Sequence, residues 1–279
     1  MESKHKLWLG LGVVCMAGSM VSCAGSSGMD GMDHSAMAMS ASEGGEGGEG
    51  GEGGEGGEGG EGGEGASSGA SVSNDAVYLG QLGFIRGHLM VGVDLYRAGD
   101  RDAAETHMKH PEAEIYAALV PALDARGAPG FASELEALAV AVERRQPLAD
   151  VEAAYANLLQ GIAAAEEVVE DPGAGLLGEV IVDLVSTAAA EYDIAAGDDL
   201  SLENAHEYQD SFGFMRVAYD VLDRIEAMGA DAGVTARIRE QMDSIMPTWS
   251  GVQPPQRLPT QPAVLYGAAS RIELAASGL

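Results

Sequence analysis

Histidine and glutamate recur at helical spacing in one short stretch of the sequence. His107 and His110 are three residues apart, and Glu114 follows His110 by four residues. On a continuous helix these spacings place the three side chains on one face, where they could bind one metal ion. Pro111 complicates the pattern because it lacks a backbone N–H and favours the start of a new helix. The stretch therefore predicts either a bent metal site or a surface elbow between two helices.

Three further polar residues lie on or beside the apolar faces of predicted helices. A helical period of about 100° per residue places Glu191 in the middle of the apolar stripe of a helix over 174–196. His88 lies at the edge of the stripe of the first long helix, and Glu207 flanks the stripe of a helix over 201–228. A buried carboxylate needs a cation, a histidine or a metal ion as its partner. These residues are therefore candidates for one interior site.

The interior site is predicted to bind a transition-metal ion. Its expected ligands are His88, His107, His110 and Glu191, with Glu114 and Glu207 completing or orienting the site. Imidazole and carboxylate ligands suit several ions, so copper, iron, manganese and zinc all stay open. His206 falls on the side of its helix opposite the apolar stripe and is expected to face solvent.

Sulfur and imidazole also cluster near the N-terminus. Among small residues between positions 29 and 39 stand Met29, Met32, His34, Met37 and Met39. Thioether sulfur together with imidazole suits Cu(I). The stretch over 32–37 resembles the Met-Asp-His-Ser-x-Met elements of periplasmic copper-resistance proteins, which implies that this tail collects copper. A chance enrichment in methionine is the alternative.

The first 22 residues have the pattern of a signal peptide. Lys4 and Lys6 precede an apolar run that is too short to span a membrane and ends in small residues before Cys23. Ser22 followed by Cys23 resembles the lipobox of bacterial lipoproteins. The resemblance implies export and a lipid anchor on Cys23, in the outer membrane facing the periplasm or the cell surface. An ordinary secretory signal is the alternative.

Composition divides the rest of the chain into a linker and a domain. A Glu-Gly-Gly repeat from 43 to 65 cannot form a helix or a strand, because glycine is flexible and the like charges repel. The predicted organisation is a signal peptide over 1–22, a lipidated Met/His-rich segment over 23–42, a disordered linker over 43–75 and a helical domain over 76–279.

The C-terminal domain is predicted to be all-α, a single bundle of about eight to nine helices behind a disordered tether. Alanine, leucine, valine and glutamate recur at helical spacing, and glycine and proline interrupt the pattern. The predicted helices lie near 77–98, 101–109, 111–126, 131–145, 149–170, 174–196, 201–228, 231–246 and 263–276.

Charge and motifs exclude several classes of function. The chain carries 44 Asp and Glu against 15 Lys and Arg, a formal charge of −29. Such a chain repels nucleic acid. A glycine-rich phosphate loop is missing from the sequence, so neither nucleic acid nor a nucleotide is an expected partner. Beyond residue 23 the chain has no apolar run of roughly 18 residues, the length that suggests a membrane helix.

The helical domain is not assigned to a family from its sequence. It contains one Glu-x-x-His element, from Glu203 to His206, whereas ferritin-like di-iron proteins use two. It is similar to imelysin-like exported proteins in compartment and helix content. It lacks their Gly-x-His-x-x-Glu motif, because no glutamate follows Gly87 and His88 at the required position.

These features together predict a cell-envelope lipoprotein whose helical domain binds a transition metal for storage, delivery or sensing. It would contact the membrane through its lipid anchor and could have a protein partner in the envelope. One alternative is a metal-dependent oxidase or hydrolase that uses the same residues around an open coordination position. Another is a scaffold protein whose histidines and glutamates form only a structural network.

Overall fold

The computed structural model describes the backbone of residues 68–279, and side chains there except those at 68, 110 and 112–114. Several predicted features therefore lie outside the described residues and stay predictions. They are the signal peptide, the lipidation site Cys23, the tail residues Met29, Met32, His34, Met37 and Met39, and the repeat over 43–65.

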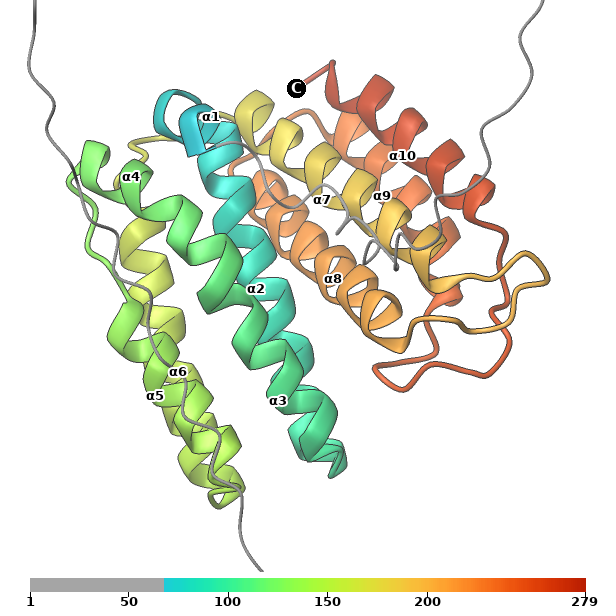
Figure 1. Ribbon diagram of the computed structural model, residues 1–279. Coiled ribbons are helices and arrows are strands. Elements are labelled where there is room, and N and C mark those ends of the chain that lie inside the picture. The colour runs from blue at the N-terminus through green and yellow to red at the C-terminus, as the bar shows by residue number, and fades with distance from the viewer. Residues whose placement is uncertain (1–67) are drawn as a thin grey trace, which may run out of the picture. The chain divides into compact units, whose positions relative to one another are not determined.

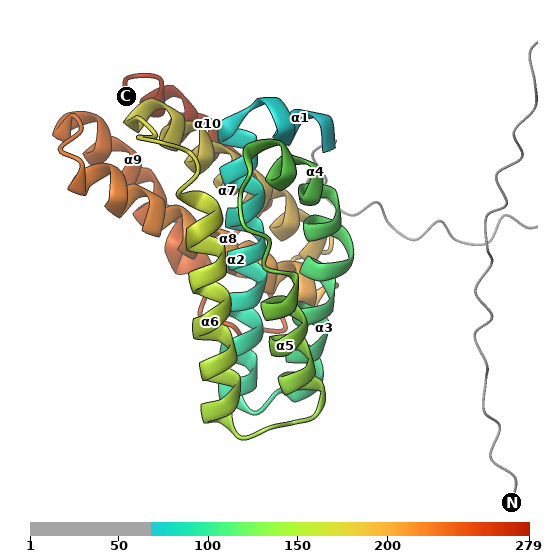
Figure 2. The same cartoon turned by 90° about the vertical axis from the view of Figure 1, so that its left-hand side faces the viewer.

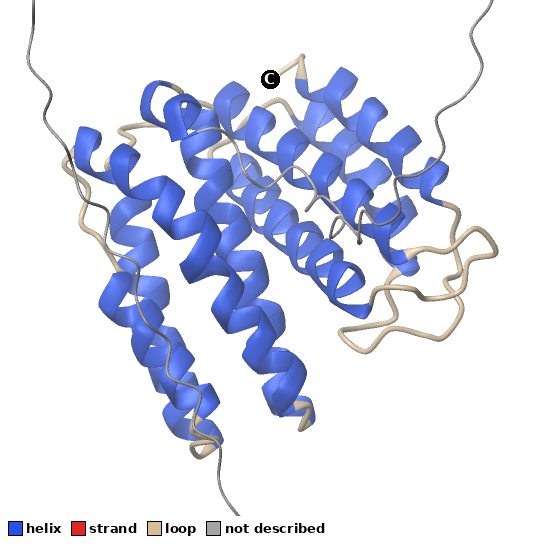
Figure 3. Ribbon diagram, in the orientation of Figure 1, coloured by secondary structure: helices blue, strands red, loops and turns tan. Residues whose placement is uncertain are grey.

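Helices make up most of the described region, and Figure 3 shows no strand within it. The elements are α1 (Ser68–Ser73), α2 (Asp75–Ala98), α3 (Arg101–His110), the π-helix η1 (Pro111–Tyr116), α4 (Ala117–Arg126), α5 (Ala132–Glu143), α6 (Leu148–Glu166), α7 (Ala174–Ala195), α8 (Ala205–Ala227), α9 (Ala232–Ile245), the 3-10 helix η2 (Met246–Thr248) and α10 (Pro262–Ala276). The prediction of an all-α bundle is confirmed. None of these helices is both long and apolar enough to cross a membrane.

The helices form two groups that meet along α2, α7 and α8 (Figure 1). In the first group α2 packs on α3 and α6, and α5 lies against both α3 and α6. In the second group α7 pairs with α8, and α10 packs on both α7 and α9. Figure 2 shows α2 behind α5 and α6, on the side that faces α7 and α8. Residues of α2 and α8 are therefore well placed to build a site between the two groups.

Helical backbone continues through Pro111, contrary to the expected break at this residue. Pro111 has φ −59° and ψ −34°, and the chain runs on through η1 into α4. Proline cannot donate the α-helical hydrogen bond to the carbonyl group four residues earlier, which belongs to His107. A π-helix takes its donor from five residues along the chain instead. The wider turn thus accommodates the proline without ending the helix.

Folded structure begins earlier than the predicted boundary at residue 76. Helix α1 lies within the segment 43–75 that was expected to be a linker, and it packs against α2 and α4. Arg126 caps the C-terminal end of α1. Its Nη1 donates to the carbonyl oxygens of Ser71 at 2.8 Å and Val72 at 3.1 Å. Its Nη2 donates to Asp75 Oδ1 at 2.8 Å. An arginine thus satisfies carbonyl groups that the end of a short helix leaves without donors.

Candidate metal centre

Three histidines surround one buried carboxylate where the two helix groups meet. His88 Nδ1 lies 2.6 Å and His107 Nδ1 lies 3.0 Å from Asp210 Oδ1. His206 Nδ1 lies 3.0 Å from the other oxygen, Oδ2. The side chains of His88 and His107 are 0% exposed and that of Asp210 is 1% exposed. This cluster, His88, His107, His206 and Asp210, is called the histidine centre below.

Two glycines bring α2 and α8 close enough to build the histidine centre. A Cβ atom on Gly213 would lie 2.6 Å from the backbone oxygen of Gly87, and a Cβ on Gly87 would lie 2.6 Å from Phe214 Cδ1. Only glycine allows such an approach of two backbones. The crossing places His88, the neighbour of Gly87, beside the α8 face that carries Asp210.

Helix α3 approaches α2 in a similar way at Gly92. A Cβ atom there would lie 3.2 Å from His107 Cβ and would also collide with the end of the Met108 side chain. The close approach directs the His107 ring inward, where it stacks on His206 with ring centroids 4.2 Å apart and an angle of 10° between the planes. Phe214 packs edge-on against His88, with centroids 5.1 Å apart. Aromatic packing thus holds all three imidazoles in place.

Gln209 fixes which nitrogen of His107 carries a proton. Its Nε2 donates to the backbone oxygen of Val252 at 3.2 Å, and this carbonyl can only accept. Its Oε1 must then face His107, where it accepts from Nε2–H at 2.9 Å. The Nδ1 of His107, which faces Asp210, therefore has two options. It either carries a second proton or directs its lone pair at a cation.

The charges in the histidine centre stabilise one another. Burial raises the pKa of Asp210, but the charge of His88 and hydrogen bonds from the three histidines outweigh it and hold that pKa well below 3.8. Burial lowers the pKa of His206, but hydrogen bonds to Asp210 and Glu207 raise it from 6.5 to about 10. A buried carboxylate in this setting stays ionised because cationic groups face it.

Two glutamates extend the histidine centre toward α7. Glu207 Oε2 lies 3.9 Å from His206 Nδ1, and Glu207 Oε1 accepts a hydrogen bond from Asn204 Nδ2 at 3.2 Å. Burial raises the pKa of Glu207, but hydrogen bonds with His206 and Glu191 outweigh it, and the pKa is lower than usual. Glu191, 1% exposed, supports Glu207 from α7. A continuous polar network therefore runs from α7 through α8 to α2 and α3.

The donor atoms fit a transition-metal ion. Two sets each bring nitrogen and oxygen donors within 4.8 Å of one another: His88, His107 and Asp210, and His206, Glu207 and Asp210. Imidazole with carboxylate suits iron, zinc and copper. The Nδ1 to oxygen distances are those of hydrogen bonds, so an ion would replace protons that these contacts now share. The Gln209 contact to His107 is the outer hydrogen bond that orients a metal-binding imidazole.

Sequence reasoning identified part of this site. The structure brings the predicted ligands His88 and His107 together and places Glu207 and Glu191 in the same network. The side chains of His110 and Glu114 lie outside the description, so their predicted role stays a prediction.

The prediction that His206 faces solvent is wrong, and Asp210 and Gln209 were missed. The reason is that α8 is buried on two sides, against α7 and against α2. The predicted stripe marked only one of them. A usable signal exists on the other: Gly213, Phe214 and Val217 form a second apolar face of α8, which His206 and Asp210 extend at helical spacing.

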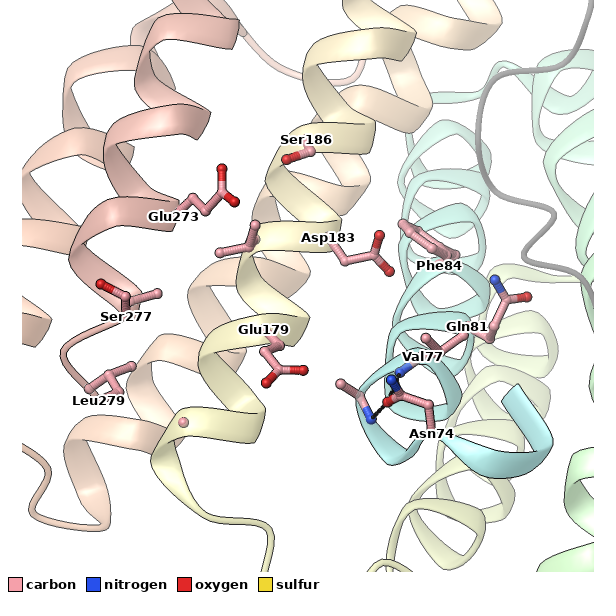
Figure 4. A pocket seen from close by; sticks show the side chains of 14 residues that line it. Asn74, Val77, Gln81, Phe84, Glu179, Asp183, Ser186, Glu273, Ser277 and Leu279 are labelled. Carbon is pink, nitrogen blue, oxygen red and sulfur yellow. Dashed lines mark hydrogen bonds between the residues drawn. The ribbon is translucent and has the colours of Figure 1, made fainter. Parts of the chain in front are cut away.

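A separate acidic pocket lies between α2, α7 and α10. It has a volume of about 680 Å³, and the carboxylates of Glu179, Asp183 and Glu273 share its lining with apolar side chains such as Phe84. Figure 4 shows Glu179 and Asp183 on the side of α7 that faces α2, and Glu273 on α10. Among the residues that the structure describes, no basic side chain lines this pocket. Burial raises the pKa of Asp183, whose Oδ2 would lie 2.7 Å from a Cβ atom on Gly80.

Comparison with known proteins finds a similarity in the second helix group. Residues 174–278, which span α7 to α10, match the iron permease-associated 4-helix bundle domain family. The helical domain, left without a family by sequence reasoning, is thus similar to this family over its C-terminal half. Neither the curated proteins nor the solved structures contain a match to the chain. The matched segment contains Asp210, His206 and both glutamates, whereas His88 and His107 come from the helices that precede it.

Proposed function

We propose that this chain is a cell-envelope protein that binds a transition-metal ion and serves iron uptake. The ion would be held by His88, His107 and Asp210, between the two helix groups. The protein would store or deliver the ion, and Cys23 would attach it to the membrane by a lipid.

One observation carries the proposal: imidazole nitrogens converge on a buried carboxylate, and a hydrogen bond to Gln209 fixes the tautomer of His107. The Gln209 contact places the proton of neutral His107 on Nε2 and leaves Nδ1 to bind an ion beside Asp210 Oδ1. A core that needed only stability would gain as much from apolar residues of similar volume. The arrangement therefore supports a binding role more than a purely structural one.

Iron is the favoured ion because the description of the matched family names an iron permease. We extend that association to this chain and propose that its partner is a membrane permease that receives the ion. Nitrogen and oxygen donors are compatible with iron, although they bind copper and zinc as well.

Burial of the inner ligands favours holding an ion over turnover. His88, His107 and Asp210 are at most 1% exposed. A catalytic metal needs an open position for substrate or water, which such deep burial disfavours. Storage or delivery is therefore preferred to the oxidase or hydrolase alternative.

Thermal unfolding with and without added ions tests the proposal. An ion that binds only the folded protein stabilises it by about 2.7 kcal/mol at one hundred times its Kd. For a domain of this size the Tm should rise by about 5–10 °C. Fe²⁺, Mn²⁺, Cu²⁺ and Zn²⁺ are added separately to the wild type, to Asp210→Asn and to His107→Gln. Both variants should lose the rise.

Asp220→Asn is the matched control, because Asp220 is an exposed aspartate on the same helix, in a surface ion pair with Arg86. This variant should keep the full metal-dependent rise. A wild type whose Tm ignores all four ions would reduce the histidine centre to a structural network. A rise that persists in both Asp210→Asn and His107→Gln would place the ion elsewhere in the chain.

A further inference from the structure

We infer that the histidine centre binds two metal ions at once, bridged by the carboxylate of Asp210. The inner ion would take His88 and His107, and the outer ion would take His206 and Glu207. The inference rests on the proposed function, since it concerns the number of ions at the same site.

The two oxygens of Asp210 face different partners. Oδ1 lies 2.6 Å from His88 Nδ1 and 3.0 Å from His107 Nδ1, whereas Oδ2 lies 3.0 Å from His206 Nδ1. A single ion held by all three histidines would draw them toward one point. Instead, the histidines are divided between the two oxygens, as expected for a carboxylate that bridges two ions.

The spacing of the imidazoles matches a pair of ions. His107 and His206 lie almost parallel, at an angle of 10°, with ring centroids 4.2 Å apart. Each ring directs its Nδ1 at a different oxygen of Asp210. Two ions bound in the planes of these rings would be separated by about 4 Å, and two-metal sites in proteins have separations of about 3.5–4 Å.

Carboxylates are placed to balance the charge of a second ion. Glu207 completes the outer set with His206 and Asp210, and its carboxylate is hydrogen-bonded to Glu191 on α7. Asp210, Glu207 and Glu191 together offer three carboxyl groups against two divalent ions. A second cation in a largely buried site needs such compensation.

The two sets differ in their access to solvent. The side chains of His206 and Glu207 are 24% and 21% exposed, against 0% for both inner histidines. An outer ion should therefore exchange with chelators sooner than an inner ion. Loading and release are expected to occur in two steps.

Electron paramagnetic resonance of the Cu²⁺-loaded full chain tests the inference. Cu²⁺ is the probe because it binds nitrogen and oxygen donors most tightly among the divalent first-row ions. Two Cu²⁺ ions bridged by a carboxylate couple their spins and give a half-field signal, which isolated ions elsewhere in the chain do not give. Wild type should develop this signal between the first and the second equivalent bound at the centre.

The variants Glu207→Gln and His206→Gln should lose the half-field signal and keep the first, slowly released ion. Glu203→Gln is the matched control, because Glu203 is an exposed glutamate just before α8 and belongs to neither set. It should keep both ions. A wild type that retains one Cu²⁺ but shows no coupled signal at any loading overturns the second ion and leaves the proposed function intact. If wild type retains no more Cu²⁺ than Asp210→Asn, the proposed function itself fails.

Discussion

The histidine centre and the acidic pocket both contain carboxylates, yet the pKa values of their aspartates are shifted in opposite directions. In the histidine centre Asp210 is 1% exposed and its pKa is held well below the ordinary value, because three imidazoles face it. In the acidic pocket no basic side chain of the described region lines the wall, and burial raises the pKa of Asp183. The contrast shows that a group of acidic residues does not by itself make a binding site. Only the first region supplies the nitrogen donors that a transition metal prefers.

Replacing one aspartate in each region should give the largest difference between the two regions in the free energy of unfolding. Asp210→Asn removes the charge that compensates three buried imidazoles, and breaking such a buried pair costs about 3–5 kcal/mol. Asp183→Asn should instead raise the free energy of unfolding slightly, because it removes a carboxylate whose ionised form is disfavoured by burial.

Urea unfolding of both variants at neutral pH measures the two effects. The gain from Asp183→Asn should disappear as the pH falls below the raised pKa of Asp183, since the wild-type carboxyl is then protonated. Destabilisation of similar size in both variants would show that the regions do not differ in the way described.

Glycine-to-alanine variants test whether close backbone packing matters in the histidine centre and not in the acidic pocket. At Gly213 a Cβ atom would lie 2.6 Å from the backbone oxygen of Gly87, so α2 and α8 must move apart. Overpacking of this kind costs about 1–3 kcal/mol, and Gly213→Ala should also weaken metal binding by moving His88 away from Asp210. Gly175, which lines the acidic pocket, has its nearest neighbour at 3.8 Å.

Gly175→Ala should therefore stabilise α7 by about 0.5–1 kcal/mol, the usual gain at an unconstrained helical position. Unfolding midpoints and the metal-dependent shift in Tm are measured on both variants. An unchanged metal response in Gly213→Ala would contradict the role of the α2–α8 crossing in positioning the histidines.

The pH dependence of the metal-free protein tests the protonation of the histidine centre. The pKa of His206 is about 10 in the folded protein against 6.5 for an ordinary histidine. A raised pKa stabilises the fold fully below pH 6.5, and this contribution is lost as the pH rises toward about 10. Wild type should therefore lose more stability between pH 6.5 and pH 10 than His206→Gln does.

Chemical unfolding at several pH values in this range, with metal removed by a chelator, provides the measurement. The difference between the two proteins isolates His206 from the lysines and tyrosines that also titrate there. Parallel curves for wild type and His206→Gln would mean that the contact between His206 and Asp210 does not hold the proton.

Most of the fold follows from local sequence patterns, whereas the site depends on packing that those patterns do not contain. The predicted helices over 77–98, 174–196 and 263–276 end within a few residues of α2, α7 and α10, because glycine, proline and capping residues act locally. Pro111 was misjudged because the π-helix that accommodates it is rare.

The apolar stripes of the predicted helices located only part of the histidine centre. His88 and Glu191 lie on stripes that face the core, and both are buried as expected. Helix α8 is covered on two sides, and a single stripe could not show that His206 and Asp210 face α2. Knowledge of which helix occupies the centre of the bundle would have been needed.

The hydrogen bond from Gln209 to Val252 links the histidine centre to the loop between η2 and α10. The same loop is held by Tyr208, whose hydroxyl accepts from the backbone N–H of Ser250 at 3.1 Å. Trp249, in the same loop, is 5% exposed and lies edge-on to Tyr192 with ring centroids 5.9 Å apart. The only other tryptophan of the chain, Trp8, belongs to the predicted signal peptide. Once the predicted signal peptide is removed, Trp249 would be the one tryptophan left, and its emission should report when an event at His107 reaches this loop.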